Sequence, residues 1–466
     1  MSNNNQQNGD AELKKGLKGR HLSMISVGGV IGAGFFMGAG STINTAGPAV
    51  VFAYLVGGFI TLLVMMLLTE MAVSNPVAGS FQVYARKGVS PYAGFLTGWT
   101  YWLAFLMGPA SETIAAGTFL HLWFPQVPIW IFCLAVALLM TIINLIGVAV
   151  FGEVEFWLSM IKVVALLVFI VWGCLAMGFH MNSGVTVTNM VSNGGFAPAG
   201  ILGLLGAMII VMFSYGGTEA IGTAAEESIN PERDIPKALR GTVFRIVVLF
   251  VISIGVLVCV LPWQQAGISS SPFVEACRIL GGSTAANIMN FVVLTAALSC
   301  IDSGVYATSR MLFSLSRDGY FPKVFSKVDE KHQTPVVAIF VSSLVLFVGA
   351  IVYLAFPDFA YVYLASVSGF GFLFSWLMIA LSQPKMRRLT LEDDPAKLKW
   401  KCPGVKVIQP LSVVLMIGIL VAQLFVPGGK ITLLSGLIWL CFVSIYYFTI
   451  GKKMREKTLM QQGIDE

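Results

Sequence analysis

Long apolar runs with very few charged residues constrain the fold of this chain most. Cut at prolines, glycines and charge clusters, they give twelve segments of roughly 20 to 30 residues, the length that an α-helix needs to cross a bilayer. Charged residues make up 11% of the 466 residues, against about a quarter in soluble domains. We therefore expect an all-α polytopic membrane protein. Its predicted spans are residues 23–45, 48–74, 93–120, 128–149, 155–178, 200–225, 241–262, 284–314, 336–356, 359–382, 406–427 and 431–450.

The distribution of positive charge predicts the orientation of these spans. If the N-terminal tail is cytoplasmic, 26 of the 29 Lys and Arg residues fall in cytoplasmic segments. Only Arg278 and Lys430 fall outside, and Lys162 lies within a span. Cytoplasmic loops of membrane proteins carry such an excess of Lys and Arg. We expect a multi-pass protein of the cytoplasmic membrane with both termini in the cytoplasm, and no cleaved signal peptide, because the polar N-terminal segment contains no short apolar region.

Glycines interrupt two spans in a similar way. The first contains GGVIGAGFF at residues 28–36, and the sixth contains FSYGGTE at residues 213–219. A helix of the second half lies five spans after its counterpart in the first half. Because five is an odd number, the two helices would cross the membrane in opposite directions, and the two halves would have opposite topology. Paired interruptions in inverted repeats are typical of a transporter binding site near the membrane midplane. The alternative for the first span is an unbroken helix whose GxxxG glycines only allow close packing.

A broken helix exposes backbone groups that can bind both ends of an amino acid. The N–H groups of Ala33 and Gly34 could hold a carboxylate. Carbonyls near Val30, Phe213 and Gly216 could accept hydrogen bonds from an ammonium group. The predicted substrate-binding residues are Val30, Gly32, Ala33, Gly34, Glu112, Phe213, Ser214, Tyr215, Gly216, Thr218 and Asp302.

Ionisable residues within spans are costly and often functional. Lys162 either extends its ammonium to the cytoplasmic interface or is a desolvated amine that gains and loses a proton during transport. Glu112 and Asp302 either face the cavity, where they would bind a polar or cationic substrate side chain, or pair with helix-end groups. Glu153, like Glu70 and Glu155, lies nearer a cytoplasmic end, and we include Glu153 among the coupling candidates.

The sixth-span interruption carries two candidate gating residues. Glu219 could gate the site or relay a proton, or it could be a structural carboxylate bonded to backbone amides. Tyr215 lies inside the interruption and is a candidate gate or wall of the binding site.

Signatures of catalysis are missing from the sequence. It contains no GxSxG, HExxH or Walker A motif. All four histidines fall outside the predicted spans, and the seven cysteines show no metal-binding or CxxC spacing. We expect neither an enzyme nor an ATP-driven pump, and no cofactor or metal ion.

Several motifs in one order give the chain a family resemblance. It resembles the amino acid/polyamine/organocation transporter superfamily, and most closely its bacterial amino acid permease branch. The motifs are GAG at 32–34, PVAGSF at 76–81, GWTYW at 98–102, EFW at 155–157 with Ile161-Lys162, YGGTE at 215–219, NPE at 230–232, IPK at 235–237, SGVY at 303–306 and SRM at 309–311.

The resemblance implies a LeuT-like core of five-plus-five inverted helices with two further C-terminal helices, which moves an amino acid by alternating access. Lys162 matches a fifth-span lysine that replaces a sodium site in proton-coupled relatives. The implied organisation is an N-terminal tail (1–22), a first repeat (23–178), a second repeat (200–382), two helices (406–450) and a C-terminal tail (451–466). Asp302 departs from the branch, which usually carries Asn before this Ser-Gly pair.

These features predict a secondary transporter that imports an amino acid by proton symport, with Lys162, Glu219 and Glu153 in coupling or gating. Its expected partners are the amino acid, protons and membrane lipid, without nucleic acid. An exchanger or uniporter without proton coupling is the alternative. A membrane amino acid sensor is less favoured, because the predicted tails have only about 22 and 16 residues. Neutral and cationic substrates remain alternatives, since Asp302 could favour a cationic amino acid.

Overall fold

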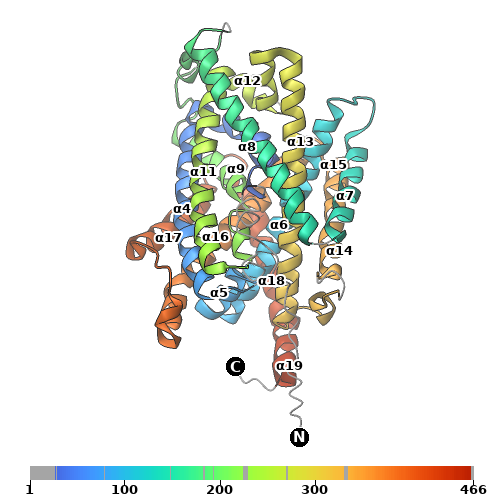
Figure 1. Ribbon diagram of the computed structural model, residues 1–466, viewed down its shortest axis with the longest axis vertical. Coiled ribbons are helices and arrows are strands. Elements are labelled where there is room, and N and C mark those ends of the chain that lie inside the picture. The colour runs from blue at the N-terminus through green and yellow to red at the C-terminus, as the bar shows by residue number, and fades with distance from the viewer. Residues whose placement is uncertain are drawn as a thin grey trace.

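The computed structural model describes residues 27, 29–77, 79–146, 148–181, 184–192, 194–223, 229–268, 271–329 and 334–462. These residues form helices joined by turns and loops, without strands (Figure 1). Within this part of the chain, ten helices are long and apolar enough to cross a membrane. One of these ten, Ala33–Ser74, joins parts of the first and second predicted spans, and the fourth predicted span forms the shorter apolar helix Ile129–Leu145.

The helices follow the predicted spans closely. Their bounds are α2 Ala33–Phe36, α3 Gly38–Ala46, α4 Val50–Ser74, α5 Phe81–Gly88, α6 Pro91–His121, α7 Ile129–Ile146, α8 Val148–Gly178, α9 Gly200–Tyr215, α10 Ala220–Thr223, α11 Pro231–Val260, α12 Trp263–Ile268, α13 Pro272–Arg317, α14 Val336–Leu344, α15 Leu346–Ala355, α16 Ala360–Asp393, α17 Val405–Ala422, α18 Gly429–Tyr446 and α19 Lys452–Gln462. Five short elements, η1 Gly47–Ala49, η2 Val187–Met190, η3 Lys323–Ser326, η4 Pro395–Lys397 and η5 Tyr447–Gly451, lie between or after them.

Several helices are longer than their apolar runs. Helix α11 begins ten residues before the predicted start of its span, with Pro231 in its first turn and Glu232 and Asp234 nearby. Proline and acidic residues suit this position, since the first N–H groups lack helical partners. Hydropathy therefore located the membrane-depth part of this helix but not its polar start. Helix α13 also begins early, and a kink at Gly281 and Gly282 separates its first nine residues from the rest.

Both glycine-rich interruptions are real breaks. Residues 31 and 32 are not helical, and α2 begins at Ala33. In the sixth span α9 ends at Tyr215, Gly216 is extended, and Gly217 has φ +100° before α10 begins at Ala220. Glycine is required at Gly217, because other residues are strained at such a positive φ. Residues 23–26, Gly28, Gly147 and residues 224–225 of the predicted spans lie outside the described residues.

Small residues let the central helices pack closely around these breaks. Helix α6 packs extensively against α13 and α16. A Cβ added at Gly304 would lie 2.2 Å from Pro109 Cγ, and one at Gly371 would lie 2.7 Å from Ala104 Cβ. By contrast, the outer helices expose large apolar side chains, among them Val414 on α17 and Phe442 on α18. Such a surface is suited to lipid.

Polar contacts gather at the end of the molecule where Figure 1 places α5 and α19. Asp318, just after α13, accepts a hydrogen bond from Gln82 (2.9 Å) and lies 3.3 Å from the Arg86 guanidinium. At the same end of α4, buried Glu70 accepts hydrogen bonds from Gln383 (2.7 Å) and the Cys402 amide (2.6 Å). The predicted N-terminal tail lies outside the described residues.

Candidate substrate-binding site

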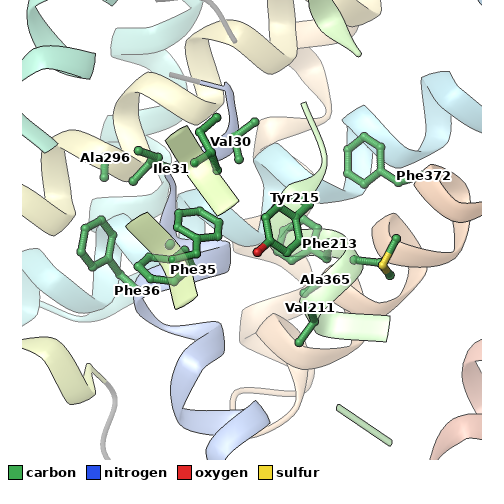
Figure 2. Close-up of a cluster of buried hydrophobic side chains, with 14 of the residues drawn as sticks. Val30, Ile31, Phe35, Phe36, Val211, Phe213, Tyr215, Ala296, Ala365 and Phe372 are labelled. Carbon is green, nitrogen blue, oxygen red and sulfur yellow. The ribbon is translucent and has the colours of Figure 1, made fainter. Parts of the chain in front are cut away.

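A small internal cavity lies where the two helix breaks face each other. Its volume is about 30 Å³, which is room for little more than one water molecule. Both breaks contribute backbone to its wall, and Val30, Phe213 and Phe372 belong to the buried apolar cluster in Figure 2. The lining residues are Gly29, Val30, Gly34, Phe105, Gly108, Pro109, Glu112, Phe213, Gly216, Cys300 and Phe372.

The carboxylate of Glu112 accepts hydrogen bonds from the backbone amides at the first break. Its Oε2 accepts a hydrogen bond from Ala33 N (2.8 Å) and its Oε1 accepts one from Gly34 N (2.9 Å). These are the amides that the sequence suggested for a substrate carboxylate. The geometry therefore matches the sequence alternative in which Glu112 pairs with helix-end groups, and it demonstrates that this pair of N–H groups can hold a carboxylate.

Side chains from the second half of the chain bind the other side of the first break. The Ser214 hydroxyl donates to Gly34 O (2.7 Å), and the Tyr361 hydroxyl donates to Ala33 O (2.9 Å). The carbonyls of Val30 and Phe213 each accept one local backbone N–H, at 3.0 Å. Because a carbonyl oxygen has two lone pairs, each can accept a second hydrogen bond.

The two breaks touch each other directly. A Cβ added at Gly217 would lie 2.5 Å from the carbonyl oxygen of Gly29. At Gly32 an added Cβ would lie 2.3 Å from Cys300 Sγ, and at Gly216 it would lie 2.3 Å from the Phe372 ring. These glycines are thus needed for close approach as well as for conformation.

Lys162 connects the first break to two other helices. Its side chain is fully buried, and its Nζ donates to Ile31 O (2.8 Å) and to Ser299 Oγ (2.9 Å). Ser299 in turn donates to Glu155 Oε1 (2.5 Å). In this structure the ammonium lies inside the helix bundle and does not extend to an interface.

Glu219 is bonded within its own break. Its Oε1 accepts from Gly217 N (3.1 Å), and its Oε2 accepts from Trp376 Nε1 on α16 (3.0 Å). The Thr218 hydroxyl donates to Tyr215 O (3.2 Å). These contacts are those expected of a structural carboxylate, one of the two alternatives that the sequence leaves for Glu219.

Of the predicted site residues, those that do not line the cavity are Gly32, Ala33, Lys162, Ser214, Thr218, Glu219, Tyr215, Asp302 and Glu153. The Tyr215 hydroxyl donates to Tyr54 O on α4 (2.8 Å). Asp302 is fully buried and accepts a hydrogen bond from Asn144 on α7 (2.7 Å). Glu153 has an exposed side chain near the start of α8, whereas Glu155, two residues later, is buried.

Sequence reasoning missed most of the cavity wall. Phe105, Gly108 and Pro109 lie within a continuously apolar span, and neither charge nor an interruption distinguishes Phe372 or Cys300 from other apolar residues. The proline inside α6 was the one usable signal, because an internal proline removes a helical hydrogen bond.

The chain is similar to known amino acid permeases over nearly its whole length. The amino acid permease family matches residues 21–460. The chain is 39% identical to the gamma-aminobutyric acid permease of Bacillus subtilis (strain 168) over 460 residues, 97% of this chain and 98% of the relative. It is 40% identical to the amino-acid permease RocE of the same organism over 462 residues, with the same coverage of both chains.

A third relative comes from another organism. The aromatic amino acid transport protein AroP of Escherichia coli (strain K12) is 39% identical over 464 residues, again 97% of this chain and 98% of the relative. A family match over nearly the whole chain and relatives covered almost end to end lead to one conclusion. The chain is a multi-pass membrane protein that belongs to the amino acid permease family.

Proposed function

We propose that this protein imports an amino acid across the cytoplasmic membrane together with protons, by alternating access. The proposal includes twelve spans, a five-plus-five inverted core in residues 23–178 and 200–382, two further helices in 406–450, and cytoplasmic termini. Its main support is the cavity at the meeting point of the two helix breaks, lined by backbone of both. Non-helical backbone at membrane depth is tolerated where it lines a cavity, and transporters bind substrate there.

The substrate carboxylate would bind the N–H groups of Ala33 and Gly34 in place of Glu112. Glu112 lines the cavity and already demonstrates the required hydrogen bonds. Two carboxylates cannot share one pair of donors, so substrate binding would displace the Glu112 side chain. The substrate ammonium would bind the free lone pairs of the Val30, Phe213 and Gly216 carbonyls. Substrate binding would thereby replace the hydrogen bonds of Glu112 to these two amides by hydrogen bonds of the substrate carboxylate.

The walls of the cavity favour a substrate with an uncharged, apolar side chain. Phe105, Phe213 and Phe372 contribute rings, and Glu112 is the one lining residue that carries a formal charge. Asp302, which raised the cationic alternative, does not line the cavity. Relatives named for aromatic amino acids and for gamma-aminobutyric acid are compatible with an uncharged side group. The cavity has a volume of only about 30 Å³, which is too small for an amino acid, so aromatic rings of its wall would move when substrate enters.

Proton coupling would act through Lys162. The protonated side chain attracts the Ile31 carbonyl at the first break while it also binds Ser299. Loss of the proton removes one donor and the positive charge, so the contact with Ile31 weakens. Proton and substrate would then stabilise the same closed state of the first break, which is the differential affinity that coupling requires.

Uptake by the purified protein in liposomes tests this function. Labelled neutral, cationic and acidic amino acids are each offered with and without an inward proton gradient. We expect gradient-driven accumulation of amino acids with apolar side chains. Counterflow without accumulation under any gradient would identify an exchanger instead, and preference for cationic amino acids would overturn the assignment of the cavity wall.

A further inference from the structure

A second group of buried polar side chains adjoins Lys162 but does not line the cavity. Ser299 on α13 accepts a hydrogen bond from Lys162 and donates one to Glu155 on α8. Asp302 lies about one turn further along α13, towards the end that contacts α5, and accepts from Asn144 on α7. A polar network thus continues from the coupling lysine between three helices.

Three oxygens in this network have no hydrogen-bond partner within the part of the chain that the structure describes. They are Glu155 Oε2, Asp302 Oδ2 and Ser303 Oγ, although the Ser303 hydroxyl lies close enough to Glu155 to stabilise its carboxylate. Both carboxylates are 0% exposed and Ser303 is 1% exposed. A buried polar atom without a partner is rare and costs free energy. Each orphaned oxygen therefore indicates a missing donor or cation.

The charges around the network do not balance. Asp302 interacts electrostatically with Glu155, and Glu155 in turn interacts with the ammonium of Lys162, so among the described residues Asp302 has only a second carboxylate as its charged neighbour. Other ionisable groups on the surrounding helices include Glu112 on α6, Cys133 on α7, the exposed Glu153 on α8, and Cys300, Tyr306 and Arg310 on α13. Glu112 is held by backbone amides, and Arg310 lies two turns beyond Asp302 along α13. An uncompensated carboxylate at membrane depth is expensive.

A proton satisfies this site better than a metal ion. Hard cations such as Ca²⁺ take about six or more oxygen ligands, whereas three unpartnered oxygens are present here. The neighbouring ammonium of Lys162 also repels a second cation. By contrast, one proton on a carboxylate removes a negative charge and converts an orphaned acceptor into a donor.

We propose that Glu155 and Asp302 form a second proton-binding site, distinct from Lys162, so that each transport cycle carries two protons. Lys162 carries one proton, and the Glu155–Asp302 pair carries the other. This inference rests on the proposed proton symport and adds its stoichiometry. Ser299 is a positioning residue, because its hydroxyl joins the lysine to the pair.

The proton stoichiometry can be measured at zero net flux. Purified protein is reconstituted in liposomes with equal potassium on both sides and valinomycin, which holds the membrane potential at zero. A proton gradient of about one pH unit is imposed, and the accumulation ratio of a neutral amino acid is read when uptake stops. Each coupled proton contributes about tenfold to this ratio. We expect about 100-fold accumulation for the wild type and about tenfold for Asp302→Asn.

Asp302→Asn keeps the oxygen that accepts from Asn144 but cannot take up a proton. Asp302→Glu restores a carboxyl group and should return the ratio to about 100-fold. Thr308→Val is the matched control, since the hydroxyl of this buried residue donates to the Gly304 and Val305 carbonyls of its own helix α13. We expect the wild-type ratio from it. Because the ratio is an equilibrium quantity, a slow variant still gives a valid reading.

Two results would overturn the second site. They are a wild-type ratio near tenfold and an Asp302→Asn ratio equal to that of the wild type. Wild-type protein that equilibrates substrate without accumulation at any proton gradient would instead overturn the proposed symport. The two failures are therefore distinguishable in one set of vesicles.

Discussion

The two helix breaks are similar in sequence but are stabilised in different ways. At the first break, ionisable side chains of other helices bind the backbone, with Glu112 on two amides and Lys162 on the Ile31 carbonyl. At the break in the sixth span (the sixth break), the stabilising carboxylate belongs to the break itself, because Glu219 accepts a hydrogen bond from Gly217 N. Trp376 then fixes Glu219 to α16.

This difference indicates which break responds to ligands. A substrate carboxylate or a proton changes the groups that hold the first break, because both act on Glu112 or Lys162. Neither ligand competes directly for the hydrogen bonds of Glu219. We infer that the first break is the responsive element and the sixth is the firm surface against which it closes.

The largest expected effect comes from the contact between the breaks. In Gly217→Ala the new Cβ would lie 2.5 Å from the Gly29 carbonyl oxygen, at a residue with φ +100°. Strain of this kind costs about 1 to 3 kcal/mol, and the breaks could not close on each other. We expect at least a tenfold loss of uptake in liposomes and a lower thermal midpoint.

Gly418→Ala on α17 is the control for this substitution, because nothing lies within 4 Å of the added Cβ. It should leave uptake and thermal midpoint unchanged. Normal uptake by Gly217→Ala would show that the breaks need not approach each other as closely as they do here.

A smaller effect is expected at the first break. Glu112→Gln keeps one acceptor oxygen for either Ala33 N or Gly34 N and loses the charge, a difference of about 1.5 kcal/mol. If Glu112 competes with the substrate carboxylate, the variant should bind substrate about tenfold more tightly. Equilibrium binding to purified protein measures this. Weaker binding would mean that Glu112 contacts the substrate, and would end the competition account.

The smallest effect is expected at the sixth break. Glu219→Gln retains an oxygen for either Gly217 N or Trp376 Nε1 but loses the charge, at a cost of about 1 kcal/mol. We expect a lower thermal midpoint and an unchanged accumulation ratio under a proton gradient. A changed ratio would give Glu219 a part in coupling and remove the distinction between the breaks.

The membrane-depth helices and both breaks were accessible from sequence, because hydropathy and glycine clusters are local signals. The first-break amides and their ability to hold a carboxylate followed from the same local pattern. The identity of their occupant did not, since Glu112 lies 79 residues from Ala33. Trp376 and Asn144 are likewise joined to their carboxylates by contacts between distant helices, which no pattern along the chain encodes.

Accumulation by wild-type protein and Lys162→Ala, in matched liposomes under an inward gradient of about one pH unit, tests the central claim most directly. The account predicts accumulation of a neutral amino acid against its gradient by the wild type. It predicts at most equilibration by Lys162→Ala, because the proton no longer acts on the Ile31 carbonyl. Equal accumulation by both proteins would contradict coupling through the first break.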